Sequence, residues 1–299
     1  MNNINYTFIV PHKNCPQLLN RCIDSIPVRE DIQIIVVDDN SDDDKKPSII
    51  RAGVETVLLN KADSNGAGKA RNVGLEKAKG KWLLFADADD YYSDNLNILL
   101  DKYANDETTD LVYLNACVFD EQGVKTKYKT DKLIIDYLNG RKNSEMRLRY
   151  SLWTPWSRMV KRLLVVNNEI TFDELPAGND IMFGLKSSRY SKIIQTESNV
   201  IYNYYKPISG SITDHAREKM VDSRLILRGN IIEFYRKVGY KSNYNFLSLI
   251  ISYNKNEGST LSDTIRKYKD YLAKYNTSLL SDFTRYIKSK IHNFFIQLK

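Results

Sequence analysis

The sequence predicts an α/β fold: a mostly parallel sheet with helices on both faces, followed by a helical C-terminal extension. Over the first 120 residues, short apolar runs alternate with helical patterns, which is typical of parallel strands joined by crossover helices. The apolar runs are continuous, as expected for strands buried on both faces. After about residue 216 the pattern is helical and rich in Lys, Arg and Tyr.

The predicted elements follow this alternation in order. We expect strands at residues 7–10, 33–37, 56–59, 81–85 and 111–118, and helices at 15–26, 45–52, 67–79 and 94–104. A partly helical polar stretch, 120–150, precedes strands near 169–172, 192–196 and 200–205 and a helix over 179–188. We therefore expect one domain over 1–215, with halves at 1–120 and 121–215, and a helical extension over 216–299.

Composition limits the class of protein. The chain has 299 residues, 42% apolar and 27% charged, which is enough to bury a full core. No apolar run reaches the roughly 18 residues of a spanning helix, and we find no signal-type apolar run at the N-terminus. The three cysteines form no C-x-x-C pair, which favours reduced thiols. We expect a cytoplasmic protein.

The net charge of +7 is unevenly distributed. Residues 1–120 hold 13 Lys and Arg against 20 Asp and Glu, whereas residues 121–299 hold 31 against 17. A basic half favours an anionic partner, such as a phosphorylated substrate or a membrane surface. Because no zinc-finger spacing, basic-leucine pattern or aromatic single-strand platform is present, we expect no nucleic-acid partner.

Acidic residues follow two of the predicted strands. Asp87, Asp89 and Asp90 come directly after the strand at 81–85, and Asp38-Asp39 follows the strand at 33–37. The carboxyl ends of parallel strands share one edge, where ligands bind in such sheets. Alone, the D-x-D is an acidic turn that caps the next helix. Together these acids indicate a site for Mg²⁺ or Mn²⁺ held by carboxylates and substrate phosphates.

The glycine-containing stretch that begins at Asn65 is not a phosphate-binding loop. A P-loop has four residues between its glycines and Ser or Thr after the lysine, but here one residue separates Gly66 from Gly68 and Ala70 follows Lys69. We expect a helix whose small residues pack closely on the sheet. Arg71 on this helix either points toward the strand ends or lies on the surface.

Several blocks together resemble family-two glycosyltransferases of the GT-A fold. They are V-V-D-D-N-S (36–41), N-G-A-G-K-A-R-N-V-G-L (65–75), K-G-K-W-L-L-F-A-D-A-D-D (79–90), W-S-R (156–158), I-T-F-D (170–173), G-N-D-I-M-F (178–183) and Y-K-P-I-S-G-S-I (205–212). The resemblance covers about residues 6–215. It implies a Rossmann-like GT-A sheet and a metal-dependent, inverting transfer of a hexose or N-acetylhexosamine from a nucleotide diphosphate, UDP above all. The implied acceptor is a hydroxyl of a saccharide or lipid-linked saccharide in cell-surface polysaccharide assembly.

The resemblance also implies residue roles at the donor site. The carboxylate of Asp39 accepts from the nucleobase, with the Pro11 backbone in the same pocket. Arg71 lies near the nucleotide and Asp87 near the ribose, while Asp89 binds Mn²⁺ or Mg²⁺ with Asp90 in support. His215, on the polar loop after Gly210, is a candidate for a further metal ligand.

At the acceptor side, Asp180 matches the position of the family's general base. The alternative role is a cap for the helix that it precedes, and an Asp at a helix N-terminus stays ionised in either role. Asn179 stands where many relatives have Glu, next to the acceptor. Trp156 either stacks on an acceptor sugar, as Trp153 also would, or packs in the core around Pro155.

Two other classes of protein share parts of this pattern. A nucleotidyltransferase uses a similar sheet and metal site but has a glycine-rich basic loop after its first strand, and Pro11-His12-Lys13-Asn14 is not such a loop. An inactive nucleotide-sugar-binding protein would not keep Asp87, Asp89 and Asp180 together. Residues 281–299 space apolar side chains at helical intervals among Lys and Arg. This segment either contacts the anionic inner face of the cell membrane or packs on the α/β domain.

Overall fold

In a computed structural model of the chain, the structure describes residues 4–49, 51–120, 122–123, 125–206, 221–256 and 260–297. The chain divides into two compact units, Met1–Ser209 and Gly210–Lys299. Each unit is described by itself.

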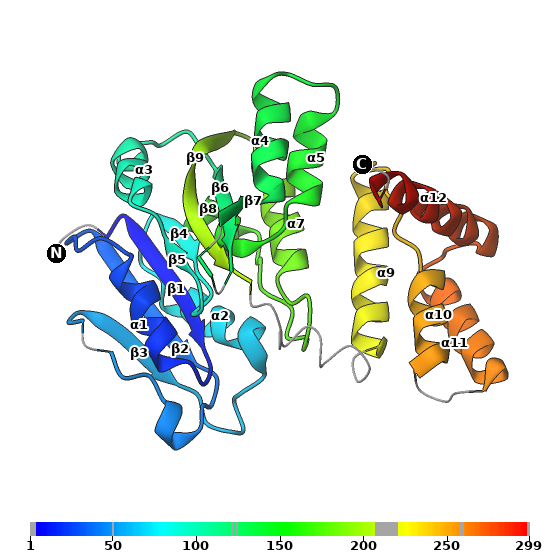
Figure 1. Cartoon of the computed structure of the whole chain (residues 1–299), viewed down its shortest axis with the longest axis horizontal. Coiled ribbons are helices and arrows are strands. Elements are labelled where there is room, and N and C mark those ends of the chain that lie inside the picture. Colours follow the sequence, from blue (N-terminus) through cyan, green and yellow to red (C-terminus); the bar gives the residue numbers. More distant parts are fainter. Residues whose placement is uncertain are drawn as a thin grey trace. The chain divides into compact units, whose positions relative to one another are not determined.

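The first unit is a mixed sheet (Figure 1). Its strands lie in the order β3 (Val54–Leu58), β2 (Ile32–Asp38), β1 (Tyr6–His12), β4 (Trp82–Phe85), β8 (Arg158–Lys161), β6 (Leu111–Phe119), β9 (Ile194–Tyr205) and β5 (Tyr91–Tyr92), with β7 (Lys125–Lys127) paired to β6. The β3–β2–β1–β4 part is parallel. β8 runs antiparallel to both β4 and β6.

Helices cover both faces of this sheet because successive side chains of a strand point to opposite sides. On β1, Phe8 and Val10 pack in the cluster that includes Leu19 of α1 (Pro16–Asp24) and Leu99 of α3 (Asn95–Tyr103). Ile9 packs in the other cluster. That cluster also draws on three further helices, α4 (Lys129–Leu138), α5 (Ser144–Ser151) and α7 (Ile181–Tyr190). The predicted α/β class with helices on both faces is confirmed.

α2 (Gly66–Lys77) packs closely on the sheet, as its small residues predict. A Cβ added at Gly74 would lie 2.4 Å from Cγ2 of Ile9, so only glycine allows this approach. Three residues on the opposite side of this contact, Gly68, Arg71 and Asn72, touch the 172–179 segment instead. α2 therefore connects the sheet to the segment that precedes α7.

Some predicted elements differ. No helix spans 45–52. The chain forms only the short turn η1 (Asp43–Lys45), because Lys46 is extended before Pro47. Residues 169–172 form a loop rather than a strand. The strands predicted at 192–196 and 200–205 are one strand, β9, whose register with β6 shifts around Asn115. The short strands β5, β7 and β8 and the helix α6 (Arg162–Asn167) lie outside the predictions.

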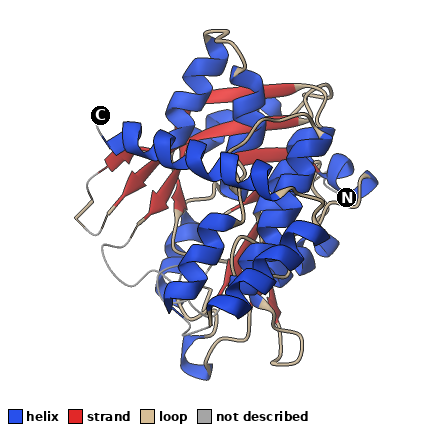
Figure 2. Cartoon of the chain, turned by 90° about the vertical axis from the view of Figure 1, so that its right-hand side faces the viewer, coloured by secondary structure: helices blue, strands red, loops and turns tan. Residues whose placement is uncertain are grey.

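The described residues of the second unit form helices and loops (Figure 2): α9 (Val221–Lys237), α10 (Leu247–Asn256), α11 (Leu261–Lys274) and α12 (Leu279–Gln297). Their core includes Leu225, Phe246 and Leu272. The buried Asp282 joins α12 to the start of α10, because its carboxylate accepts the Phe246 and Leu247 N–H groups. Within the described ranges, every helix is too short or too polar to cross a membrane.

Candidate functional site

The ends of β1, β2 and β4 meet at one edge of the sheet. In the parallel register His12 lies beside Asp38, and Ile9 lies beside Phe85. The acids that follow β2 and β4 therefore emerge on the same edge.

Asp39 holds the start of α2 against the end of β2. Its Oδ1 accepts the Gly66 N–H at 3.1 Å and the Ser64 hydroxyl at 2.8 Å. Lys13 Nζ lies 3.3 Å from Oδ2. The Asp39 side chain is buried, and so is Pro11 near the end of β1. Asp39 and Pro11 thus lie at the strand ends where the sequence predicts the nucleobase, and the base contact itself stays a prediction.

His12 is a component of this edge for which the sequence predicted no partner. Its Nδ1 lies 2.7 Å from Asp38 Oδ1, and the Cys15 N–H donates to Nε2 at 3.2 Å. Because Nε2 accepts, the ring proton is on Nδ1 and is donated to Asp38. Ser41 also donates to Asp38 through its hydroxyl. Only the register of β1 and β2 reveals this buried arrangement, since 26 residues separate His12 from Asp38.

Arg71 joins residues that are far apart in the sequence. Its Nη2 lies 2.5 Å from Asp87 Oδ1, and its Nη1 donates to Asn179 Oδ1 at 2.9 Å. The guanidinium lies 5.4 Å from the Phe172 ring, and the residue is only 5% exposed. The surface alternative for Arg71 is therefore wrong. The blocks at 65–75, 79–90 and 178–183 meet at this one side chain.

The acidic loop after β4 is held by aromatic residues of β9. The Tyr202 hydroxyl donates to Asp90 Oδ2 at 2.7 Å and accepts the Asp87 N–H at 2.9 Å. The Tyr205 N–H donates to Asp90 Oδ1 at 2.6 Å. Burial, followed by the charges of Asp87 and Asp89, raises the pKa of Asp90 well above its usual range. Asp90 therefore fixes the acidic loop to β9 through these two hydrogen bonds.

Asp89 differs from Asp87 and Asp90 because its carboxylate has no side-chain partner among the described residues. Arg21 donates to its backbone carbonyl at 2.5 Å, but no side chain among the described residues hydrogen-bonds or pairs with its carboxylate. Burial and, next, the charge of Asp87 raise the pKa of Asp89 to about 6. A divalent cation would relieve both effects.

The residues present fit such a cation. Hard oxygen donors are what Mg²⁺ and Mn²⁺ prefer, and such ions are usually bound by one or two carboxylates plus substrate phosphates. Asp89 offers both oxygens and Asp87 keeps the one that Arg71 does not contact. Among the described residues, no group of three or more His, Cys, Asp or Glu is placed to hold a metal. Donor phosphates and water would supply the remaining ligands.

Asp180 directly precedes α7, whose residues are all described, and its side chain makes no capping hydrogen bond to that helix. Burial raises its pKa, while Arg71 opposes this shift. An Asp with a raised pKa is a stronger base than an ordinary carboxylate. The sequence suggested that the helix N-terminus would hold the pKa of Asp180 down. The pKa is raised instead, because burial has the larger effect.

The remaining predicted residues have different outcomes. Asn179 turns its side-chain oxygen to Arg71. Trp156 is 4% exposed, and its ring stacks on Tyr202 at 4.9 Å and on Tyr204 at 5.5 Å. This geometry favours the core role for Trp156, and its contact with an acceptor stays a prediction. His215 lies outside the described residues.

A second tryptophan, Trp153, contacts Lys129 and packs against α7, the helix that Asp180 precedes. The half-buried Trp153 has Lys129 Nζ 4.8 Å from its ring. Burial lowers the pKa of Lys129, and the charge of Asp180 opposes this effect, which places the two groups in electrostatic reach. A Cβ at Gly184 of α7 would lie 2.2 Å from the Trp153 carbonyl. The sequence offered Trp153 as the less favoured of the two tryptophans.

The known proteins that this chain is similar to are glycosyltransferases. The model of glycosyl transferase family 2 matches residues 7–159. Poly(ribitol-phosphate) beta-N-acetylglucosaminyltransferase TarS of Staphylococcus aureus is 23% identical over 96% of this chain and 50% of that protein. Poly(ribitol-phosphate) beta-glucosyltransferase of Bacillus spizizenii is 25% identical over 67% of this chain and 31% of that protein.

Solved structures share the fold. Residues 1–349 of S. aureus TarS in complex with UDP-GlcNAc superpose with a TM-score of 0.63 at 19% identity, covering 91% of this chain and 80% of that one. The mannosyltransferase PcManGT of Pyrobaculum calidifontis, in complex with GDP-Man and Mn²⁺, gives 0.51 at 17% identity, covering 96% and 80%. The chain spans only 31% to 66% of the length of the first curated relatives that it matches.

Proposed function

The chain belongs to glycosyltransferase family 2, and we propose that it transfers a hexose or N-acetylhexosamine, with inversion, from a UDP-linked donor to a saccharide hydroxyl. The observation that carries the proposal is the Arg71 bridge, which brings Asp87 of the acidic loop and Asn179 of the acceptor half together beside Asp180. A nucleotide-binding edge and a candidate base thus share one site.

The donor half would bind the nucleotide. Asp39, directly after β2, would accept from the nucleobase, and the Ser64 and Gly66 contacts fix its orientation. Asp87, oriented by Arg71, would meet the ribose. The buried charge of Arg71 sets the geometry of this loop before any ligand arrives, which lowers the cost of ordering the site on binding.

Asp89, with Asp87, would hold Mn²⁺ or Mg²⁺, and that ion would neutralise the diphosphate as it leaves. PcManGT, the mannosyltransferase noted above, carries Mn²⁺ with its nucleotide sugar. Asp90 and Arg21 hold the backbone of the loop, so they position Asp89 without contacting the donor.

Asp180 would accept the proton of the attacking hydroxyl. Loss of that proton would make the oxygen a stronger nucleophile as it bonds to the anomeric carbon, while the bond from this carbon to the diphosphate breaks on the opposite face. The raised pKa of Asp180 suits proton acceptance, and Arg71 and Arg158 keep the carboxylate ionised by opposing the shift. Trp153 and Lys129, which lie against each other, would contact the acceptor beside Asp180.

The acceptor class is proposed from the relatives and from charge. Two relatives are named for poly(ribitol-phosphate), and residues 121–299 carry 31 Lys and Arg against 17 Asp and Glu. An anionic or lipid-linked saccharide of the cell surface would suit such a surface.

A ligand screen followed by two variants tests the proposal. With Mn²⁺ present, one of a panel of UDP-, GDP- and dTDP-sugars is expected to raise the melting temperature, since a ligand that binds only the folded chain stabilises it. Asp89→Ala should lose the Mn²⁺-dependent part of that shift. Asp180→Asn should keep the shift and lose transfer by roughly 10²- to 10⁴-fold. Full transfer by Asp89→Ala without metal would reject the cation's role, and loss of donor binding in Asp180→Asn would reject the base.

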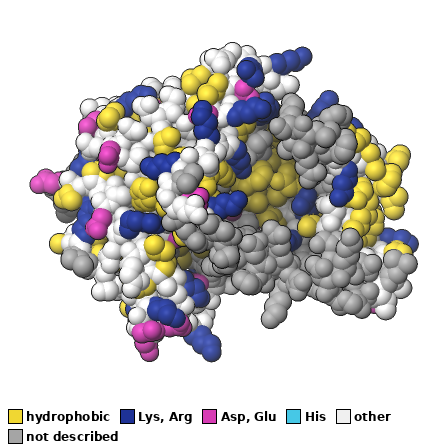
Figure 3. All heavy atoms as spheres, in the orientation of Figure 1, with side chains coloured by type: hydrophobic (Ala, Val, Ile, Leu, Met, Phe, Trp, Pro, Cys, Tyr) yellow, Lys and Arg dark blue, Asp and Glu magenta, His cyan; other side chains and the backbone are white. Residues whose placement is uncertain are grey.

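Membrane contact through the tail is a further part of the proposal. Apolar side chains gather on the exposed side of α12, at the right-hand edge of Figure 3. Five of them are 40% to 74% exposed: Leu279, Leu280, Phe283, Ile287 and Ile291. Phe283→Ser with Ile287→Ser should weaken binding to anionic vesicles at low salt. Unchanged binding would reject this contact.

A further inference from the structure

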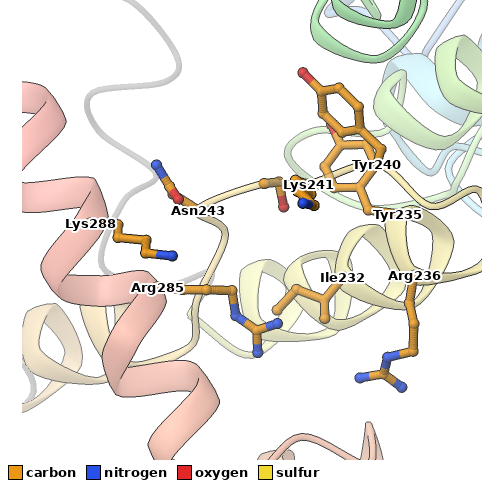
Figure 4. Close-up of a pocket in the computed structure, with 9 residues that line it drawn as sticks. Ile232, Tyr235, Arg236, Tyr240, Lys241, Asn243, Arg285 and Lys288 are labelled. Atoms are coloured by element: carbon orange, nitrogen blue, oxygen red, sulfur yellow. The ribbon is translucent and has the colours of Figure 1, made fainter.

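We propose that the helical unit contains a binding site for a phosphate group, in a cavity between α9, α12 and the loop that follows α9. The cavity has a volume of about 330 Å³. Figure 4 shows Arg285 and Lys288 extending from α12 toward α9 and this loop. All of the lining residues belong to the second unit.

Four cations line this cavity: Arg236, Lys241, Arg285 and Lys288. They come from α9, from the loop and from α12, so folding brings together charges up to 52 positions apart. None of the residues that line the cavity is acidic. Like charges are costly to hold together in a partly buried place unless an anion compensates them. The composition of the cavity lining therefore favours an anionic ligand.

Arg285 supplies the most specific part of the argument. Its Nε and Nη2 atoms are buried and have no hydrogen-bond partner among the described residues. The nearest acid, Asp282, lies 3.8 Å away, and its carboxylate already accepts from Phe246, Leu247 and Tyr268. A buried donor without a partner costs about 1–3 kcal/mol.

Those two nitrogens form one edge of the guanidinium. This edge matches two oxygens of a phosphate in a bidentate pair. Burial lowers the pKa of Arg285; the charge of Asp282 opposes this effect and the charge of Arg236 adds to it. A bound phosphate would satisfy both donors and offset both charges.

The other three cations have distinct roles. Arg236 Nη2 donates to the carbonyls of Tyr275 and Asn276, which fixes its charge in the wall. Lys241 and Lys288 are exposed, and no acid among the described residues pairs with them. They are therefore free to close on a ligand.

Two basic neighbours outside the cavity behave differently. Lys237 pairs with Glu233 at 2.7 Å and Lys267 with Asp222 at 2.6 Å. Of the four cavity cations, only Arg285 lies within 4 Å of an acid in the described ranges, and that acid is already hydrogen-bonded elsewhere. Ile232 and Tyr235 add apolar surface beside them, so a phosphate ester, in which the phosphate is attached to carbon, fits the lining.

The test uses the full chain and inorganic phosphate. Isothermal titration should show one phosphate per chain, and Arg285→Gln with Lys288→Gln should weaken binding at least tenfold. The matched control is Arg266→Gln with Lys269→Gln, which makes the same change of charge on exposed positions of α11 and should alter binding less than twofold. Absence of binding to the unmodified chain, or an equal loss in the control, would overturn the site.

A second pair of variants and a second probe complete the design. Lys241→Gln with Lys288→Gln changes only exposed side chains, so it remains informative if Arg285→Gln does not fold. Vesicles of phosphatidylglycerol, compared with phosphatidylcholine, identify the source. Vesicle binding that inorganic phosphate displaces, and that is lost in the Arg285 and Lys288 variant, supports a lipid headgroup. Phosphate binding without vesicle binding supports a soluble phosphate ester. Neither the phosphate titration nor the vesicle assay depends on the donor site. A failed phosphate site and a failed proposed function would therefore give different results.

Discussion

Gly68→Ala is expected to slow transfer by displacing the segment that carries the candidate base. A Cβ at this position would lie 2.2 Å from the Asp173 carbonyl oxygen and 3.0 Å from Asn179 Cβ. Real Cβ atoms essentially never approach another atom closer than 3.0 Å, so the carbonyl must move by at least 0.8 Å. The Asp173 N–H donates to the Asn179 carbonyl at 2.9 Å. The shift is therefore transmitted to Asn179 and to the adjacent Asp180.

The magnitude follows from that displacement. Misplacing a reacting group by about 1 Å costs up to 10²-fold in rate, so we expect kcat to fall by roughly 10- to 100-fold. Overpacking also destabilises a protein by about 1–3 kcal/mol. The Arg71 contact with Asn179 should weaken as well, because both groups lie at the displaced end.

Gly74→Ala is the matched control, since it makes the same substitution on the same helix. Its Cβ would lie 2.4 Å from Ile9 Cγ2, on the core side. The control should lose similar stability but keep kcat per folded molecule within about threefold, as its clash leaves the 173–180 segment in place. The assay is release of nucleoside diphosphate from the donor found by the screen, with thermal melts of both variants. Full kcat in Gly68→Ala would refute the coupling of α2 to the base.

Two further predictions concern pH. A base at Asp180 would have to be ionised, and burial raises its pKa, so activity should decline on acidification at a pH above the ordinary 3.8 of Asp; a pH–rate profile falling only near 3.8 would contradict this. Burial alone would raise the pKa of Asp106, but hydrogen bonds from Thr108 and Thr109 lower it to about 2. Its stabilisation is therefore complete above 3.8 and lost as the pH falls through 2. Allowing for partial exposure, Asp106→Ala should cost about 1–2 kcal/mol at pH 7, measured by urea unfolding, and the difference should vanish near pH 2.

The sequence predicts the parts of the fold that local patterns determine. β1, β2 and β4 are continuous apolar runs, and such runs identify buried strands without knowledge of their neighbours. The helix at 45–52 is wrong because a single extended residue before Pro47 outweighs the surrounding pattern. No local pattern predicts β8, because its strand character comes from pairing with β4 and β6, which are distant in the chain.

In the candidate site too, local sequence patterns predict some features, and others depend on contacts between distant residues. The order of the sequence blocks predicts that the acids lie on one edge, because parallel strands share their direction. The partners of these acids depend on folding. Arg71 reaches Asn179 across 108 positions, and Tyr202 reaches Asp90 across 112. Whether Trp156 is exposed depends likewise on the rings that β9 brings beside it.

The three acids after β4 differ in the partners that the fold gives their carboxylates. Arg71 compensates the charge of Asp87 from one side, and β9 supplies Asp90 with two hydrogen bonds from below. Asp89 has neither, although burial and the charge of Asp87 both disfavour its ionised form. A fold that only needed an acidic turn would leave such a carboxylate in solvent, where ionisation costs nothing. Asp89 is instead held partly buried with only the charge of Arg21 opposing these effects. A further positive partner would therefore stabilise its ionised form, and a donor-bound divalent cation would be such a partner.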